Sequence, residues 1–359
     1  MILLWINLAI VFISAFFARY FAASVEASTY SPVPLKPNKL LIICAFGSIL
    51  AVSGLRSNIG DTFFYKYSYE LNDFTWELVM SQKDQGFGTL QMLLKNYIST
   101  DPQILIFTTA LITNGIIFVV LYKYSRMIEL SLYVYITGGL FLVSMNGIRQ
   151  VLAAAIAFAA TKYLIDGSWV KYFLVILAAS LFHQSALILL PLYFIVRFKA
   201  WSKPTLALLI FAVLIVIGFE KFSSLLFSAI EDTQYGHYQN FAEGGANSLR
   251  VAVDLVPLLI AYLGREKLRR IFPNSDYIVN MAVLGFVFMM ISTQNWIFAR
   301  FSIYFNLYQL ILISWIVKVF RQKDEKLIYY GILTCYFVYF YYENVLNLNI
   351  LYESDYLKW

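Results

Sequence analysis

Long apolar runs are the feature of this sequence that most restricts what the chain can fold into. Stretches of about 20 apolar residues recur between short polar breaks, and a bilayer core of about 30 Å needs a helix of that length. Of the 359 residues, 60% are hydrophobic and only 13% are charged, which is more apolar surface than a water-soluble domain of this size could bury. We therefore expect an all-α, polytopic integral membrane protein.

The apolar runs predict about twelve transmembrane helices. They cover residues 1–18, 38–55, 101–122, 130–146, 148–165, 170–183, 185–197, 204–219, 249–264, 276–292, 297–318 and 328–344. No linker, low-complexity tract or repeat of fixed period divides the chain, so we treat residues 1–359 as a single transmembrane domain.

The basic residues predict the orientation of these helices, because Lys and Arg accumulate in cytoplasmic loops. Placing the N-terminus outside puts most of the 27 Lys and Arg residues on the inner side, including the basic stretch 265–270. Both termini then face outside, and the two larger outer segments are residues 56–100 and 220–248.

Several classes of protein are excluded by what the sequence lacks. Cys44 and Cys335 lie in apolar runs, where a thiol behaves as a small hydrophobe, and no zinc-ligand spacing, P-loop or dinucleotide motif is present. The net charge of +6 is spread between the apolar runs rather than gathered in a stripe, so we expect no nucleic-acid partner. We also expect no metal and no cofactor.

The expected topology brings ionisable residues from four separate segments to the outer ends of the helices. These are Arg56 with Asp61, Arg149 in "NGIRQ", His183 in "FHQSAL" and Arg300 in "TQNWIFARF". An arginine between apolar residues either extends to the membrane interface or faces a polar cavity. Because all four segments reach one face, we favour a polar cavity on the outer side.

Asp61 and His183 each allow a structural and a chemical interpretation. Asp61 follows Gly60 and lies close enough to Arg56 to pair with it, but it could equally cap the helix that "TFFYKYSYEL" predicts. Histidine has an unperturbed pKa near 6.5, so His183 suits a general base, although a structural role fits as well. The other histidine, His237, is interpreted as an ordinary residue of the second outer segment.

Two stretches of the first outer segment have compositions that suit a carbohydrate site at a membrane surface. "FFYKYSY", beside Asp61, combines flat apolar faces with hydroxyl groups that could pack against sugar rings, although aromatic residues also gather at membrane interfaces. "KDQGFGTLQMLL" (83–94) predicts an amphipathic helix lying over the cavity.

These stretches, in this order, resemble the EpsG family of Wzy-like exopolysaccharide polymerases. The similar elements are R-x-x-x-G-D-T-x-x-Y at Arg56, Gly60, Asp61, Thr62 and Tyr65, GF at Gly86 and Phe87, N-x-x-R-Q-x-x-A at Asn146, Arg149, Gln150 and Ala153, L-F-H-x-S-A at 181–186, and R-x-x-x-Y-F at Arg300, Tyr304 and Phe305. The resemblance covers roughly residues 50 to 310.

The resemblance implies a GT-C-like helical architecture and a specific reaction. The family polymerises oligosaccharide repeat units, carried on undecaprenyl diphosphate, at the outer face of the bacterial cytoplasmic membrane. Expected partners are the lipid-linked donor and acceptor, the lipid bilayer, a flippase and a chain-length regulator. The expected substrate-binding residues are Arg56, Tyr65, Arg149, Gln150, Arg300 and Tyr304.

The chemistry of the residues agrees with that reaction. Arginine presents paired planar donors that match phosphate oxygens, so Arg149 and Arg300, with Arg56 as a third, would hold the diphosphate leaving group without a metal. Attack by a sugar hydroxyl requires a base on the opposite face of the ring, for which His183 is the first candidate and Asp61 the second.

Two alternatives use the same residues differently. A transporter or flippase for lipid-linked oligosaccharides would also need arginines near phosphate, and Asp254 inside a predicted span is the residue that favours it. A membrane O-acyltransferase acting on the polysaccharide is suggested by a single histidine at the end of a span. The concentration of ionisable groups at one end of the spans favours the polymerase.

Overall fold

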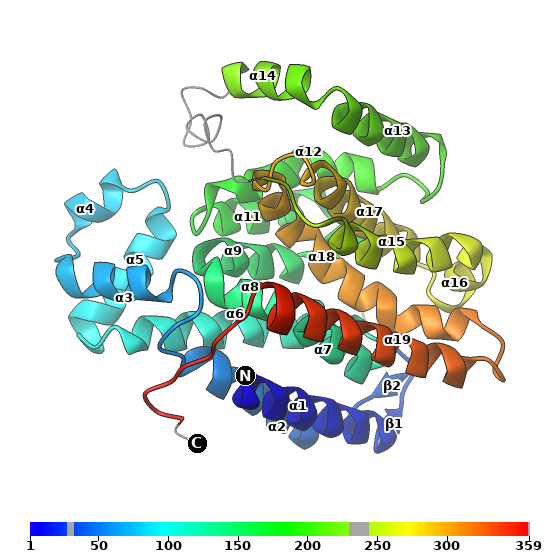
Figure 1. The fold of residues 1–359 in the computed structure, drawn as a ribbon, viewed down its shortest axis with the longest axis horizontal. Coiled ribbons are helices and arrows are strands. Elements are labelled where there is room, and N and C mark those ends of the chain that lie inside the picture. Colours follow the sequence, from blue (N-terminus) through cyan, green and yellow to red (C-terminus); the bar gives the residue numbers. More distant parts are fainter. Residues whose placement is uncertain (27–31, 230–243, 358–359) are drawn as a thin grey trace. The chain divides into compact units, whose positions relative to one another are not determined.

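The computed structural model describes residues 1–26, 32–229 and 244–357, and this part of the chain is almost entirely helical (Figure 1). Its only sheet within those ranges has two short strands, β1 (Ala23–Ser24) and β2 (Leu35–Lys36), which pair antiparallel between the first two helices. The all-α prediction is thus confirmed.

The chain divides into two compact units. Unit 1 comprises Met1–Leu190 and Ile313–Trp359, and unit 2 comprises Pro191–Leu312. The helices α12 (Leu189–Val196) and α18 (Ile297–Ile316) run from one unit into the other. The expectation of a single transmembrane domain remains a prediction.

Unit 1 is built around five helices that pack against one another. α1 (Ile2–Tyr20) packs against α2 (Lys39–Gly54) and α7 (Ile128–Thr137), while α6 (Gln103–Tyr124) packs against α2 and α9 (Ile148–Ala159). Because α6 is long and apolar on all sides, it can be covered on several faces at once, and it joins the other helices into one bundle.

Polar side chains fix the ends of these helices. The Asn38 side chain accepts hydrogen bonds from the backbone N–H groups of Leu40 and Leu41, which satisfies donors that the first turn of α2 leaves unpaired. Arg19, in the last turn of α1, donates through Nε to Oε1 of the fully buried Glu129 on α7 (2.6 Å). A buried carboxylate is costly without such a partner.

The next helices of unit 1 are shorter and bent. α7 meets α8 (Leu140–Asn146) at an angle of 55°, with Gly139 between them in the left-handed region (φ 89°) that favours glycine. α9 is followed by α10 (Thr161–Asp166) and α11 (Trp169–Ser180), and then by the 3₁₀ segment η1 (Gln184–Ile188). The predicted spans 130–146 and 148–165 are therefore broken helices.

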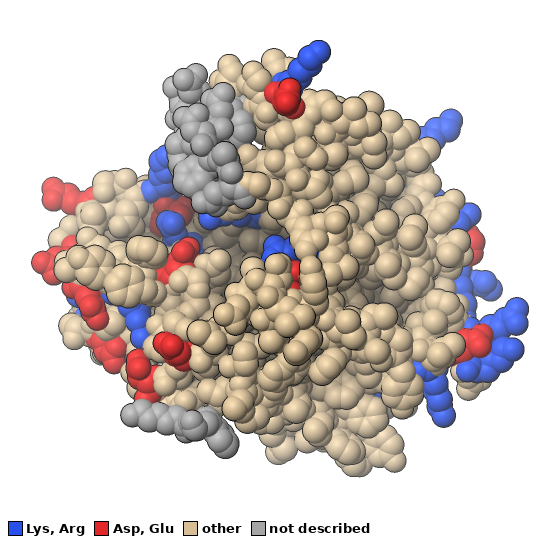
Figure 2. Space-filling model, viewed as in Figure 1, with Lys and Arg blue, Asp and Glu red and all other residues tan. Residues whose placement is uncertain are grey.

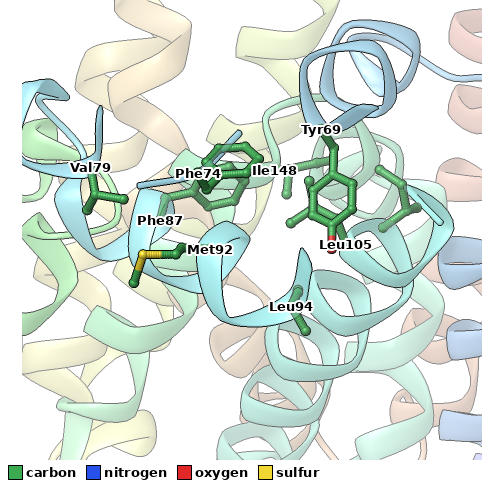
Figure 3. Close-up of a cluster of buried hydrophobic side chains, with 9 residues drawn as sticks. Tyr69, Phe74, Val79, Phe87, Met92, Leu94, Leu105 and Ile148 are labelled. Atoms are coloured by element: carbon green, nitrogen blue, oxygen red, sulfur yellow. The ribbon is translucent and has the colours of Figure 1, made fainter. Parts of the chain in front are cut away.

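Residues 56–100, the first predicted outer segment, form a helical layer that packs on a buried apolar cluster. It contains α3 (Thr62–Leu71), α4 (Trp76–Ser81) and α5 (Gln85–Tyr97). A buried cluster joins this layer to α6 and α9 (Figure 3), and its members are Tyr69, Phe74, Val79, Phe87, Met92, Leu94, Leu105, Ile106 and Ile148. Packing of this kind fixes the layer against the bundle and positions the residues between its helices.

The C-terminal part of unit 1 returns to the loop that follows α2. It contains the 3₁₀ turn η3 (Val317–Val319), α19 (Glu325–Phe340) and the π-helical segment η4 (Tyr341–Asn347). Beyond η4, the Tyr352 hydroxyl donates to the Val52 carbonyl (2.9 Å). The Ser57 N–H donates to the Glu353 carbonyl (3.0 Å). Residues far apart in sequence thus hold the 52–58 loop in place.

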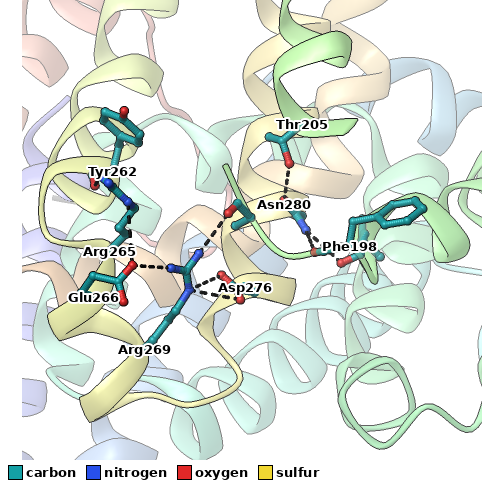
Figure 4. Close-up of polar contacts among 10 residues, drawn as sticks. Phe198, Thr205, Tyr262, Arg265, Glu266, Arg269, Asp276 and Asn280 are labelled. Carbon is teal, nitrogen blue, oxygen red and sulfur yellow. Dashed lines mark hydrogen bonds and ion pairs between the residues drawn. The ribbon is translucent and has the colours of Figure 1, made fainter. Parts of the chain in front are cut away.

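Unit 2 contains α13 (Lys203–Ile217), α14 (Phe219–Ala229), α15 (Ser248–Leu263), α16 (Arg265–Ile271) and α17 (Ser275–Ile291), with most of α18. Polar contacts connect these helices to the segments around them (Figure 4). Arg269 donates to Asp276, to Glu266 and to the Ala200 carbonyl. Asn280 donates to the carbonyls of Val196 and Phe198. Residues 230–243 of the second outer segment, including His237, lie outside the described residues.

Within the part of the chain that the structure describes, three helices are long and apolar enough to cross a membrane, and the number rises to five if each bent pair is one span. The three are Ile2–Tyr20, Gln103–Tyr124 and Ile297–Val319, and the bent pairs are Ile128–Thr137 with Leu140–Asn146 and Lys203–Ile217 with Phe219–Leu226. These helices support the membrane prediction. The number of about twelve spans and the GT-C-like architecture remain predictions.

Candidate functional site

Arg56 lies in the loop after α2 and is almost completely buried, with 1% of its surface exposed. Its Nε donates to Thr62 Oγ1 (2.9 Å), Nη2 donates to the Met145 carbonyl (2.8 Å) and Nη1 donates to the Ser53 carbonyl. Burial lowers the pKa of Arg56 to about 9, which leaves the guanidinium charged at neutral pH. The side chain joins the loop to α2, α3 and α8.

The expected pairing of Arg56 with Asp61 is wrong, because the three guanidinium nitrogens bond to other groups. Asp61 is exposed and stands at the N-cap of α3, but its side chain makes no capping hydrogen bond there. Its backbone N–H instead donates to Asn146 Oδ1 (3.1 Å).

Gly60 permits this contact between two distant motifs. A Cβ at residue 60 would lie 2.1 Å from Asn146 Oδ1, and the backbone there has φ 51°, a conformation that side chains rarely adopt. Glycine is therefore required for Asn146, at the end of α8, to reach the start of α3. The first and third motifs of the sequence meet at this point.

Arg149 contrasts with Arg56 because 44% of its side chain is exposed. It lies in the first turn of α9, where Nη1 donates to Asp84 Oδ2 (2.8 Å) and Nε donates to Tyr65 Oη (3.3 Å). The Tyr65 ring lies edge to face against Phe87, with centroids 5.8 Å apart. Arg149 is thus held by side chains from the layer of α3 and α5, while part of it remains accessible.

Asp84 connects Arg149 to the histidine-containing turn. Its Oδ1 accepts from the Gln184 N–H (3.3 Å), and only 7% of its side chain is exposed. Burial raises the pKa of Asp84, whereas Arg149 acts in the opposite direction. Two residues on, the Gly86 N–H donates to the Leu181 carbonyl (2.7 Å), and a Cβ at Gly86 would lie 2.9 Å from that oxygen.

His183 is half-buried at the start of η1, and its Nδ1 lies 2.7 Å from Ser185 Oγ. Gln150, buried in the first turn of α9, donates through Nε2 to the same hydroxyl at 3.4 Å. Ser185 therefore lies between His183 and Gln150, which links the fourth motif to the third. A proton acceptor at His183 would use Nε2, since Nδ1 is directed at Ser185.

The fifth motif belongs to unit 2, whereas the residues above belong to unit 1. Arg300 is exposed, and its guanidinium lies 4.6 Å from the centroid of the Trp296 ring, while Tyr304 is buried. Asp254, the residue that favoured a transporter, accepts a hydrogen bond from Gln309 Nε2 through its carbonyl (3.2 Å). The roles expected for Arg300 and Tyr304 remain predictions.

The surface around the site carries both acidic and basic side chains. Figure 2 shows acidic side chains over α3, α4 and α5, where Asp61, Glu70, Asp73 and Glu77 are exposed. Lys83, which directly precedes Asp84, is exposed as well, so charges of both signs surround Arg149, and an anion would be recognised by direct contact with its guanidinium. Among the described residues, no group of three or more His, Cys, Asp or Glu side chains is placed to hold a metal ion.

Sequence reasoning assigned no role to Asp84, Asn146 or Ser185, although each lies in a motif or beside one. Asp84 directly precedes the glycine-containing "QGFG", and this position beside a motif could have marked it as a candidate site residue. Asn146 and Ser185 lie within motifs, but their partners could not be identified without the fold.

Comparison with known proteins agrees with this constellation of motifs. A search of curated proteins and a search of solved structures found no match. The model of the EpsG family matches residues 39–354, nearly the whole chain. Because that range covers most of the chain and contains all five motifs, the whole of unit 2 and most of unit 1, the chain belongs to the EpsG family, a family of Wzy-like exopolysaccharide polymerases.

Proposed function

We propose that this protein polymerises oligosaccharide repeat units carried on undecaprenyl diphosphate, at the outer face of the bacterial cytoplasmic membrane. Membership of the family implies a polymerase-type glycosyltransferase in general. The observation that carries the finer proposal is the meeting of four sequence motifs in unit 1 around Arg149, a half-exposed arginine.

Arg149 is the residue that we assign to the diphosphate. Its guanidinium is held by Tyr65 and Asp84 yet remains partly accessible, and its planar donors match phosphate oxygens. Donors fixed before the reaction stabilise the charge that develops on the leaving diphosphate. Arg56 has a supporting role in this proposal, because a direct contact with phosphate would require its bonds to protein to break.

The bond that breaks joins the anomeric carbon of the donor sugar to the diphosphate, and the bond that forms joins that carbon to an acceptor hydroxyl. The hydroxyl proton passes to a base, and we retain His183 as the first candidate because Ser185 and Gln150 orient it beside Arg149's helix. Asp61 stays the second candidate, since its carboxylate is exposed.

The exposed aromatic face of α3 is the surface that we assign to sugar. Phe63, Phe64 and Tyr67 are all exposed, and the rings of Phe63 and Tyr67 stack with centroids 5.8 Å apart. Flat aromatic faces pack against the C–H groups of sugar rings, and Tyr67 adds a hydroxyl. Arg300 and Tyr304 stay proposed substrate-binding residues on the strength of their motif alone.

Polymerisation by purified protein in lipid nanodiscs tests the proposal. With undecaprenyl diphosphate-linked repeat units as the only substrate, we expect longer lipid-linked glycan and free undecaprenyl diphosphate, without nucleotide sugar, ATP or added metal. Arg149→Lys keeps the charge but loses the paired geometry, so product should fall by about 10²-fold.

Arg265→Lys is the matched control, because the Arg265 side chain is 41% exposed and lies in α16, outside the site. It should polymerise at the wild-type rate. Products that never lengthen, together with movement of the lipid across vesicle membranes, would reject the polymerase in favour of a transporter.

A further inference from the structure

Arg149 already has an anionic partner, and that partner is buried whereas Arg149 is not. The Asp84 carboxylate has 7% of its side-chain surface exposed, against 44% for Arg149, and the two are joined by a 2.8 Å bond from Nη1 to Oδ2. A charged pair of this kind reduces the positive charge that Arg149 can offer to an incoming anion.

Asp84 is held in place independently of Arg149. Its other oxygen accepts from the Gln184 N–H, and its carbonyl accepts from the Gly88 N–H in the first turn of α5 (3.0 Å). Gly86 is bonded to the Leu181 carbonyl. The carboxylate would therefore keep its position if Arg149 turned away from it, and Arg149 is the more exposed of the two partners.

A diphosphate offers Arg149 the same kind of acceptor as a carboxylate but carries more negative charge. Both ligands use the planar N–H groups of one guanidinium, so they compete for it. We propose that Asp84 is a displaceable internal counter-ion of Arg149, a positioning residue that holds the guanidinium beside Tyr65 until the lipid diphosphate replaces the carboxylate. This inference rests on the proposed function, because it takes the substrate to be a lipid diphosphate.

The exchange predicts opposite effects for the two members of the pair. Asp84→Asn keeps an amide oxygen that can accept from the Gln184 N–H, but it removes the charge that competes with phosphate. Undecaprenyl diphosphate should then bind about tenfold more tightly, because its binding no longer has to break the charge-assisted hydrogen bond between Arg149 and Asp84. Arg149→Lys should bind it more weakly.

A purely structural role for Asp84 predicts the reverse sign. If the carboxylate only held the fold of the site, its removal would loosen Arg149 and weaken binding. A general electrostatic effect is measured by Asp73→Asn, because Asp73 is an exposed acid of the same layer, between α3 and α4. Asp73→Asn should change the affinity by less than about twofold, since exposed charges are screened by salt.

The experiment measures binding of undecaprenyl diphosphate to the full-length protein in detergent micelles by calorimetry, for the wild type, Asp84→Asn, Asp84→Glu, Arg149→Lys and Asp73→Asn. Tighter binding by Asp84→Asn alone, with Asp84→Glu near the wild type, supports the exchange. Weaker or unchanged binding by Asp84→Asn, or an equal gain in Asp73→Asn, overturns it.

Polymer formation is followed in parallel, so that the two proposals can fail separately. Wild-type protein that lengthens glycan while Asp84→Asn binds the diphosphate more weakly would reject the counter-ion and keep the polymerase. Tighter binding by Asp84→Asn in a protein that lengthens no glycan would keep the counter-ion and reject the polymerase. Absence of binding in the wild type and in every variant would reject both.

Discussion

Arg56 and Arg149 begin as equivalent predictions, two arginines at the outer ends of apolar runs, and the structure gives them opposite environments. Arg56 is buried and bonds to two backbone carbonyls and a hydroxyl, whereas Arg149 is nearly half-exposed and bonds to a carboxylate and a phenol. A backbone carbonyl can release its arginine only if the local fold opens, whereas a carboxylate side chain can be replaced at the guanidinium by a ligand. The two arginines therefore divide into one that holds the loop and one that can bind.

Replacement of Arg149 should produce the largest functional effect. Arg149→Ala should lower the rate of polymerisation by about 10² to 10³, because a fixed donor to the leaving diphosphate is lost, while the protein inserts and purifies normally. Initial rates of glycan lengthening and the melting temperature are the measurements. A variant that polymerises well would place Arg149 with the structural residues and remove the contrast with Arg56.

Arg56→Ala should instead act on stability. It leaves the Ser53 and Met145 carbonyls and Thr62 Oγ1 without their buried donor, which costs about 3 kcal/mol or more of unfolding free energy. Thermal denaturation in detergent measures this loss, and Arg265→Ala is the control for removal of an exposed arginine. Wild-type stability with abolished turnover would assign Arg56 to the substrate after all.

Gly60→Ala tests the contact that places Asn146 at the start of α3. Both the 2.1 Å approach to Asn146 Oδ1 and the positive φ oppose a side chain, so we expect a loss of about 1–3 kcal/mol in unfolding free energy. Gly47→Ala is matched to it, because Gly47 lies inside α2 and a Cβ there would meet nothing within 4 Å. Equal melting temperatures for the two variants would contradict the close approach.

The smallest expected effect is a pH dependence in Arg149→Ala. Burial raises the pKa of Asp84, and Arg149 and Lys83 partly oppose this, so loss of Arg149 moves the pKa further up. A carboxyl whose folded pKa exceeds its unfolded value loses stability as the pH rises from about 4 through the folded pKa. The deficit of Arg149→Ala should therefore grow with pH and vanish in the double variant with Asp84→Asn. A deficit that shrinks with pH would reverse the sign of this coupling.

The helices were the easiest part to predict, because an apolar run of about 20 residues directly predicts a helix. The predicted ranges 38–55 and 101–122 fall on α2 and α6, and 185–197 falls on η1 with α12. The breaks within such runs were harder, since the bend after α7 depends on the conformation of Gly139 rather than on polarity. The number of spans depends on the bilayer and stays a prediction.

For the candidate site, the sequence indicated the motif residues but not which of them make contact. Arg56, Arg149 and His183 lie along a chain of contacts that runs from Arg56 through residues 145 and 146 to Arg149 and the 181–185 turn, while their common outer face stays a prediction. Which acid pairs with which arginine could not be predicted, because spacing suggested Asp61 for Arg56 while the fold brings Asp84 to Arg149 across 65 residues.

The return of residues 352–353 to the loop at 52–58 makes unit 1 discontinuous along the chain. During synthesis the Arg56 loop is made early. Tyr352 and Glu353, which bond to it, are made only after the whole of unit 2 has been translated. The first motif therefore reaches its final geometry as one of the last steps of assembly. A chain whose synthesis stops within α19 carries every motif residue in its sequence and still lacks the contacts that close the loop around Arg56.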